Sequence, residues 1–162
     1  MDKFKNPSES LGFLIYSREL FFTFWYCPKS NKKASRLEKY KKTCFYGVPG
    51  GHEFTSFVLG LYNAAGPGQA LDADVKAAIR QLPGATMKVL VSLSCTMCPE
   101  LVTAAQRIAA ENDGISAEVY DINHFPHLRE RYNVMSVPCL VINDETITFG
   151  KKNIRQLLEI LA

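Results

Sequence analysis

Two cysteines separated by two residues, Cys95 and Cys98, are the side chains of this 162-residue chain best suited to chemistry. The apolar run at 88–94 is typical of a strand, and Pro99 favours a helix start, so both cysteines should lie on the first turn of a helix. Unpaired N–H groups and the helix dipole stabilise a thiolate there. The spacing therefore predicts a redox-active dithiol, with Cys95 as the nucleophile and Cys98 as the thiol that resolves a mixed disulfide.

The neighbours of the dithiol would form the walls of its site. Thr96 and Met97 bring no positive charge, which predicts a moderately reducing couple instead of a strong oxidant. Val137-Pro138 begins a strand-like run, where proline is tolerated at the first position or with a cis bond. In a dithiol fold we expect the cis form, with Pro138 beside Cys95. The predicted walls of the site are Thr96, Met97, Pro99, Val137 and Pro138.

Zinc binding is the alternative use of a Cys-x-x-Cys pair, and His124 and His127 could complete a ligand set. However, 25 residues separate Cys98 from His124, where zinc fingers have about 12, and no second cysteine pair follows. The residues thus favour redox chemistry and predict no metal site. A zinc- or partner-binding module without redox turnover stays open as the alternative function.

Composition limits the class of protein. A hydrophobic content of 47% can form a core for one domain or two small ones, and five cysteines without dense spacing indicate a reducing compartment, so we expect a cytoplasmic protein. No apolar run reaches the about 20 residues of a membrane helix, so no membrane partner is expected. Residues 1–46 hold 10 Lys and Arg against 4 Asp and Glu. We interpret this basic segment as a solvated helix face, with no nucleic-acid partner.

Hydrophobic periodicity predicts strands and helices in alternation. Glycines and prolines at 47–51, 66–68 and 83–84 mark turns, and 66–68 lacks the third glycine of a dinucleotide loop, so no flavin or nicotinamide should bind within this chain. Strands are expected at 11–16, 21–26, 88–94, 115–121, 138–143 and 146–149, and helices at 31–42, 52–65, 72–82, 99–111, 125–132 and 151–161. From residue 88 onward this is a βαβ unit followed by a hairpin and a helix, which indicates an α/β fold.

These motifs resemble the N-terminal domain of the F subunit of alkyl hydroperoxide reductase, a flavoprotein that reduces its peroxiredoxin partner. The matching segments are Gly51-His52-Glu53-Phe54-Thr55-Ser56 with Val58-Leu59, Ser92-Leu93-Ser94-Cys95-Thr96-Met97-Cys98-Pro99, Asn133-Val134-Met135-Ser136-Val137-Pro138 and Phe149-Gly150. The chain is also similar to the glutaredoxin-like domain attached to thioredoxin-reductase-type flavoproteins. The resemblance implies an α/β thioredoxin-like fold, with a truncated or degenerate first thioredoxin-like unit packed on a complete second unit.

The resemblance also implies a division of the chain. We expect a basic segment at 1–46 that matches poorly, the helical remainder of the first unit at 47–85, and a glutaredoxin- or thioredoxin-like redox unit at 86–162. An incomplete first unit would leave an edge strand that could pair with another copy, so a homodimer is possible. Related modules are usually attached to a reductase, so the chain could be a fragment of a longer flavoprotein. Cys139 is expected to be buried and passive, and Cys27 to be incidental.

The resemblance further implies the activity and its partners. The chain would be a thiol-disulfide oxidoreductase that relays electrons from a flavoprotein disulfide reductase to a peroxiredoxin or another disulfide protein. FAD and NAD(P)H would be bound by the partner or attached reductase. A cis Val137-Pro138 bond and a third catalytic residue, Glu53, are also implied. In this family the Gly-His-Glu-Phe segment places an acidic side chain near the buried thiol, here Cys98, where a carboxylate could shuttle a proton.

Overall fold

The computed structural model describes residues 43–162 and the backbone of two short strands, β1 (Phe13–Ile15) and β2 (Phe24–Tyr26), which pair antiparallel. These two strands lie within the predicted aromatic runs at 11–16 and 21–26. The predicted helix at 31–42, the rest of the basic segment before residue 43, and Cys27 lie outside the described residues. The division into a truncated first unit and a complete second unit therefore stays a prediction.

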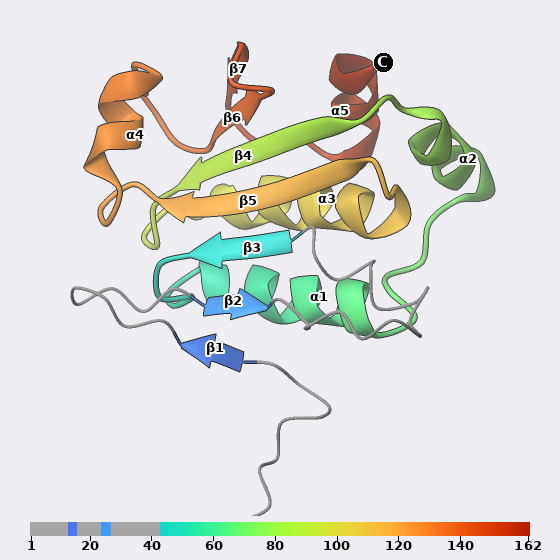
Figure 1. Cartoon of the computed structure of the whole chain (residues 1–162), viewed down its shortest axis with the longest axis horizontal. Helices are drawn as coiled ribbons and strands as arrows, with labels where there is room; N and C mark the ends of the chain where they lie inside the picture. Colours follow the sequence, from blue (N-terminus) through green and yellow to red (C-terminus); the bar gives the residue numbers. More distant parts are fainter. Residues whose placement is uncertain (1–12, 16–23, 27–42) are drawn as a thin grey trace, which may run out of the picture.

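Five strands form one mixed sheet in the order β3-β5-β4-β6-β7 (Figure 1). They are β3 (Thr43–Tyr46), β4 (Ala85–Val91), β5 (Ile115–Asp121), β6 (Cys139–Ile142) and β7 (Thr146–Phe149). β3, β5 and β4 run parallel, whereas β6 is antiparallel to β4 and forms a hairpin with β7. The hairpin turn places Asn143 and Asp144 at φ 53° and 63°, a conformation that Asn and Asp tolerate better than most residues. The predicted βαβ unit and hairpin are therefore present.

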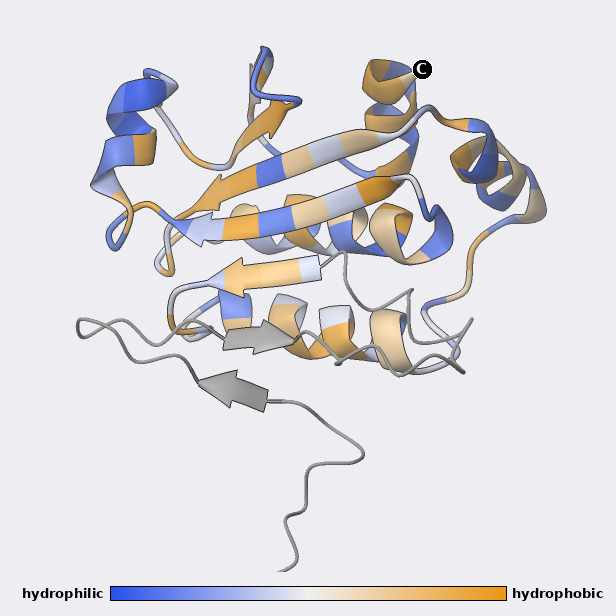
Figure 2. Cartoon of the chain, in the orientation of Figure 1, coloured by the Kyte–Doolittle hydropathy of each residue, from blue (hydrophilic) through white to orange (hydrophobic). Residues whose placement is uncertain are grey.

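Helices cover the two faces of the sheet unequally. α1 (Glu53–Ala65), α2 (Ala73–Gln81) and α5 (Ile154–Leu161) all pack on α3 (Cys98–Glu111), which crosses between β4 and β5. Side chains alternate along each strand, so β4 sends Met87, Val89 and Val91 into this helical layer. On the opposite face Leu90 packs against Leu128 of the short helix α4 (Pro126–Arg131). Hydrophilic positions interrupt the hydrophobic colour along β4 and β5 (Figure 2), as expected for strands whose second face is only partly covered.

The structure corrects three sequence predictions. β3 was not predicted, although it supplies the first strand of the sheet. The strand predicted at 88–94 runs from Ala85 to Val91, because β4 follows β5 along its whole length and the chain then turns, with the Cys95 N–H donating to the Ser92 carbonyl at 2.9 Å. The helix begins at Cys98, so Cys95 lies in the preceding turn and not on the first helical turn. None of the helices in the described part of the chain is long and apolar enough to cross a membrane.

Candidate redox site

The two cysteines are joined by a disulfide at the carboxyl end of β4, with their Cα atoms 5.6 Å apart. Cys95 is partly exposed in the turn, whereas Cys98, the first residue of α3, is 0% exposed and belongs to the main core. Pro99 occupies the first turn of α3, where no intrahelical acceptor exists for an N–H group. An external thiolate can therefore reach the sulfur of Cys95 but not that of Cys98.

The segment before β6 lies beside the exposed sulfur. Val137-Pro138 has a cis peptide bond, and the Cys95 Sγ lies 3.9 Å from the carbonyl oxygen of Val137. Thr96 and Met97 are exposed in the turn between the cysteines, with Met97 51% exposed. Of the five predicted walls, Val137 is thus placed against Cys95, Thr96 and Met97 lie between the cysteines along the chain, Pro138 is buried, and Pro99 lines a groove described below.

The turn that precedes α1, and with it Glu53, is joined to the loop that leads to the dithiol. The His52 N–H donates to the Leu93 carbonyl at 3.1 Å, which joins the start of α1 to the loop before Cys95. Gly51 sits at φ 54°, and a Cβ atom there would collide with the same Leu93 carbonyl oxygen. The Gly50-Gly51 turn is thus required both for its backbone conformation and for the close approach of α1 to the loop.

The Glu53 side chain is buried without a cation. It is 0% exposed, its Oε2 accepts a hydrogen bond from the Ser56 hydroxyl, and its Oε1 has no hydrogen-bond partner within the described part of the chain. Burial raises the pKa of Glu53 to about 7, and the Ser56 hydrogen bond opposes that rise. The carboxyl group can therefore gain or lose a proton near neutral pH.

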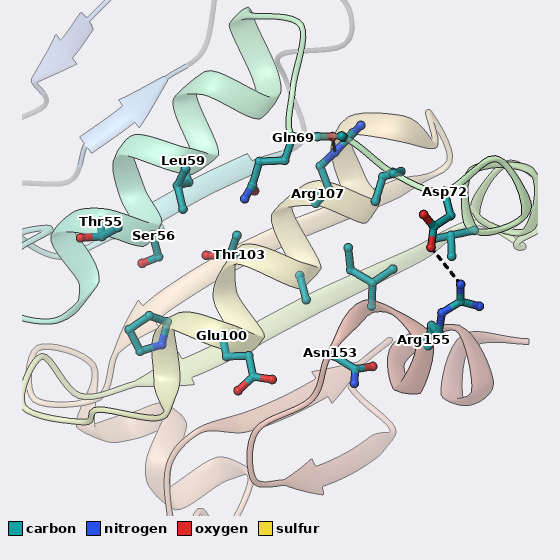
Figure 3. Close-up of a pocket in the computed structure, with 16 residues that line it drawn as sticks. Thr55, Ser56, Leu59, Gln69, Asp72, Glu100, Thr103, Arg107, Asn153 and Arg155 are labelled. Carbon is teal, nitrogen blue, oxygen red and sulfur yellow. Dashed lines mark hydrogen bonds and ion pairs between the residues drawn. The ribbon is translucent and has the colours of Figure 1, made fainter.

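A groove with a volume of about 690 Å³ separates α1 from α5 along the exposed side of α3 (Figure 3). Thr55 and Ser56 from α1 line one wall, and Pro99 and Glu100 line the start of its floor. At the far end Arg107 is buried and donates from Nε to the Gln69 carbonyl at 2.9 Å. The remaining lining residues are Leu59, Gln69, Ala70, Leu71, Asp72, Val75, Thr103, Ala104, Asn153, Ile154 and Arg155. Ser56, the partner of Glu53, and Pro99, the residue after Cys98, thus line the same groove.

The other described cysteines are buried. Cys139 is 0% exposed and packs with Leu90 and Leu128 on the opposite face of the sheet from Cys98, as expected of a buried thiol. Burial raises the pKa of the Cys139 thiol to about 11. Cys44 is buried in β3. The Cys139 thiol is therefore not suited to act as a nucleophile at neutral pH.

The histidines considered as zinc ligands have other neighbours. The Nε2 of His124 lies 3.7 Å from Oδ2 of Asp121, and the ring of His127 packs edge-on against Phe125. Among the residues that the structure describes, no three His, Cys, Asp or Glu side chains gather as a metal site would require.

Comparison with known proteins identifies the fold family. Residues 85–162 match the family described as thioredoxin domain. This part of the chain is similar to thioredoxin domains. The chain is 36% identical over 115 residues to the F subunit of alkyl hydroperoxide reductase from Pseudomonas aeruginosa, a match that covers 70% of this chain and 22% of that protein. The chain thus spans about a fifth of the length of the curated relatives that it matches.

Solved structures support the same assignment. The NTD_N/C domain of the alkyl hydroperoxide reductase AhpF from Enterococcus faecalis superposes with a TM-score of 0.73 at 41% identity, covering 76% of this chain and 59% of that one. A protein disulfide oxidoreductase from Aeropyrum pernix gives a TM-score of 0.67 at 26% identity, covering 73% and 53% of the two chains. The resemblance to the N-terminal domain of AhpF is confirmed, and so is the thioredoxin-like fold.

Three features of the site have no local signal in the sequence. Ser56 was noticed only as part of the Gly-His-Glu-Phe-Thr-Ser motif, although its place three residues after Glu53 puts it on the same side of α1. The groove was not anticipated, because its walls come from four helices whose packing no local pattern specifies. The burial of Glu53 also has no local signal, since a glutamate at a helix start is ordinarily an exposed charge.

Proposed function

We propose that this chain is a thiol-disulfide oxidoreductase that relays electrons from a flavoprotein disulfide reductase to a peroxiredoxin or another disulfide protein. The observation that carries the proposal is a disulfide with one partly exposed sulfur, at Cys95, and one buried sulfur, at Cys98. Relatives named as the F subunit of alkyl hydroperoxide reductase support the choice of partners. Because the chain matches only 22% of that relative, FAD and NAD(P)H belong to a reductase that is attached or separate.

Reduction of the domain would proceed by two exchanges. A reductase thiolate attacks the Cys95 sulfur, forms a mixed disulfide, and releases Cys98 as a thiolate that takes up a proton. A second reductase thiolate attacks the reductase sulfur of the mixed disulfide and releases Cys95 as a thiolate. Two electrons have then passed from the reductase dithiol to the Cys95/Cys98 pair, and the reductase holds the new disulfide.

Transfer to the substrate would reverse these roles. The Cys95 thiolate attacks the substrate disulfide, and Cys98 gives up its proton, attacks the Cys95 sulfur, and releases the reduced substrate. Cys98 is the resolving thiol because its burial hides it from the substrate while the Cα–Cα distance of 5.6 Å allows the disulfide to close. The substrate would contact Thr96, Met97, Val137 and Pro138, with the Val137 carbonyl beside Cys95 as a hydrogen-bond acceptor for its backbone.

Glu53 would carry the proton that Cys98 exchanges in both directions. Its carboxylic acid would protonate the departing Cys98 thiolate, and its carboxylate would take the proton back when Cys98 attacks. A pKa of about 7 supports this assignment, because general acid-base groups work best when their pKa lies near the working pH. A dithiol that must be reduced in each cycle fits a reducing compartment, and we place the protein in the cytoplasm.

A trapping experiment tests the relay. Cys98→Ser leaves Cys95 as a lone thiol with no resolving partner. Its thiolate should therefore attack and stay joined to the disulfide of an oxidised flavoprotein disulfide reductase that lacks its own thioredoxin-like domain, and likewise to the disulfide of an oxidised peroxiredoxin. The Cys95→Ser/Cys98→Ser double variant keeps the other cysteines and should trap neither. Failure of the single variant to trap either protein would refute the relay.

The zinc- or partner-binding alternative makes the opposite prediction. Protein purified under reducing conditions would carry one tightly held zinc per chain in elemental analysis. It would also fail to turn over with a coupled reductase.

A further inference from the structure

We propose that Ser56 is a positioning residue that assigns different tasks to the two oxygens of Glu53. Its hydroxyl holds Oε2, so that Oε1 alone exchanges the proton with Cys98. The inference rests on the proposed role of Glu53 in proton transfer. It specifies which oxygen of Glu53 carries the proton, and it identifies Ser56 as the side chain that selects this oxygen.

The contacts of the Ser56 hydroxyl fix its direction. The Oγ atom lies within hydrogen-bond distance of Glu53 Oε2 and 2.9 Å from the Glu53 backbone carbonyl, one helical turn earlier on α1. Both side chains are 0% exposed, so solvent does not compete for the hydroxyl. A hydroxyl has one hydrogen and can donate it to one of these acceptors at a time, and the oxygen of the carboxyl group that it contacts is Oε2.

The other oxygen of the carboxyl group is left without a partner. Oε1 is buried and accepts no hydrogen bond from any described residue. Leaving a buried carboxylate oxygen unpaired disfavours the charged form, so a proton on Oε1 relieves that cost. With Ser56 donating to Oε2 in both protonation states, only Oε1 changes between a bare oxygen and an O–H group.

One proton moves between Oε1 of Glu53 and the Cys98 sulfur in each direction of the cycle. When the Cys95–Cys98 disulfide opens, the O–H at Oε1 gives its proton to the Cys98 thiolate and Glu53 becomes a carboxylate. When Cys98 attacks to close the disulfide, its S–H proton returns to Oε1. Ser56 keeps its own hydrogen throughout and only strengthens its hydrogen bond when Glu53 is charged.

Other ionisable groups near α1 are engaged elsewhere. On α3, Arg107 donates to the Gln69 carbonyl and pairs with Glu111 at 3.5 Å, and Glu100 pairs with Lys151 at 3.5 Å. The remaining ionisable groups on the elements packed against the start of α1 are His52 in the preceding turn, Cys95 and Cys98 in the disulfide, and Cys44 and Tyr46 on β3. Among the described residues, burial and the Ser56 hydrogen bond are the two influences on the pKa of Glu53.

The test measures reduction of the intact domain by dithiothreitol, which requires no protein partner. The observed rate is divided by the concentration of dithiothreitol thiolate at each pH from 5.5 to 9, and disulfide loss is followed by thiol release. In the wild type this corrected rate should fall with a midpoint near pH 7, where Glu53 loses its proton. Ser56→Ala removes a hydrogen bond that favours the carboxylate, so the midpoint should move up by about one pH unit. Ser56→Thr keeps the hydroxyl and should restore the wild-type midpoint.

The Glu53→Gln variant distinguishes the positioning role of Ser56 from the proton-transfer role of Glu53. Glu53→Gln should abolish the pH step, and adding Ser56→Ala to Glu53→Gln should change nothing further. A wild-type midpoint in Ser56→Ala would overturn the positioning role while leaving Glu53 in place. A wild-type profile in Glu53→Gln would instead overturn the proton-transfer role.

Direct titration of the Glu53 carboxyl group tests the effect of Ser56 even where another step limits the rate of thiol exchange. The carboxyl carbon of Glu53, observed by NMR in the oxidised domain, should titrate near pH 7 in the wild type and at higher pH in Ser56→Ala. Equal titration midpoints in the two proteins would refute the proposal.

Discussion

Glu53 and Asp144 each accept a hydrogen bond from a hydroxyl but lie in different environments. Glu53, at the interface of α1 and α3, accepts from Ser56, and Asp144, in the β6–β7 turn, accepts from Tyr132 at 2.7 Å. Asp144 is exposed and pairs with Lys88 and, at 3.5 Å, with Arg131. Glu53 is buried and has no hydrogen-bonded cation among the described residues.

The two environments shift the acidity of these groups in opposite directions. Hydrogen bonds from Lys88 and then Tyr132 lower the pKa of Asp144, whereas burial raises the pKa of Glu53 to about 7. Since both groups have a hydroxyl donor, the hydroxyl does not decide the difference. Burial and the lack of a hydrogen-bonded cation among the described residues do, and they make Glu53 a carboxyl group able to change its charge near neutral pH.

Glu53→Gln should produce the largest change, in the pH dependence of stability. The pKa of Glu53 rises from its usual 4.5 to about 7 on folding, so the folded state binds the extra proton and stability is lost as pH rises through this window. The loss amounts to about 3 kcal/mol, since each pKa unit corresponds to about 1.4 kcal/mol. Urea unfolding at pH 4.5 and pH 8 should show this decline in the wild type and not in Glu53→Gln.

The matched variant Asp144→Asn should act in the opposite sense. A lowered pKa stabilises the fold above the unfolded-state pKa and loses that contribution as pH falls toward the folded-state value. Asp144→Asn should therefore leave the decline between pH 4.5 and pH 8 in place. If it removed the decline, the comparison between the two carboxyl groups would be wrong.

Exchange kinetics should separate the same two variants. General acid-base groups typically contribute about 10²-fold or more, so Glu53→Gln should slow dithiothreitol reduction at pH 6.5 by about 10²-fold. Asp144→Asn, on a surface remote from the disulfide, should stay within about twofold of the wild type. Stopped-flow measurement of both variants at one thiol concentration checks this. Equal slowing in the two would show a general effect on stability instead of proton transfer.

The sequence predicts elements well where the pattern is local. Residues 115–121 alternate between apolar and polar side chains and form β5 at those bounds. The helix before Glu111 and the β6–β7 hairpin likewise follow from periodicity and turn residues. β3 was missed because its four residues carry no alternating pattern long enough to detect, and its pairing partner β5 lies far along the chain, with Thr43 opposite Ala117.

The residues of the site also divide into those with a local sequence signal and those without one. The Cys95 and Cys98 spacing identifies the dithiol directly, and the Val137-Pro138 dipeptide gains meaning once that pair is found. Glu53 was suggested only by resemblance to a family, because nothing local reveals that a glutamate at a helix start is buried. The Asp144 cluster could not have been predicted, since Lys88 and Tyr132 reach it from β4 and from the end of α4.

Gly51→Ala should weaken the structure that brings Glu53 to the dithiol. The new methyl group would collide with the Leu93 carbonyl and the backbone would be held at φ 54°, so we expect a loss of about 2–3 kcal/mol. Gly150→Ala is the control, because Gly150 has φ 83° but no atom within 4 Å of the added methyl group, and should cost about 1 kcal/mol. Unfolding in urea compares the two. Equal losses would mean that the approach of α1 to the Leu93 loop does not constrain the site.

Tyr132→Phe should have the smallest effect and completes the comparison with Ser56. Both Tyr132 and Ser56 donate a hydroxyl hydrogen bond to a carboxyl group, but the Tyr132 acceptor is an exposed, cation-paired Asp144. The phenyl ring would keep its place in the cluster with Leu90 and Leu128. Only the hydroxyl's hydrogen bonds, to Asp144 and from Lys88, are lost, at about 1 kcal/mol because the site is exposed. The pH profile of dithiothreitol reduction should stay that of the wild type, whereas in Ser56→Ala it should shift. Lys88 contacts both Tyr132 and Asp144 and lies on β4, seven residues before Cys95. A shifted profile in Tyr132→Phe would therefore mean that Asp144 and Glu53 are coupled through the sheet.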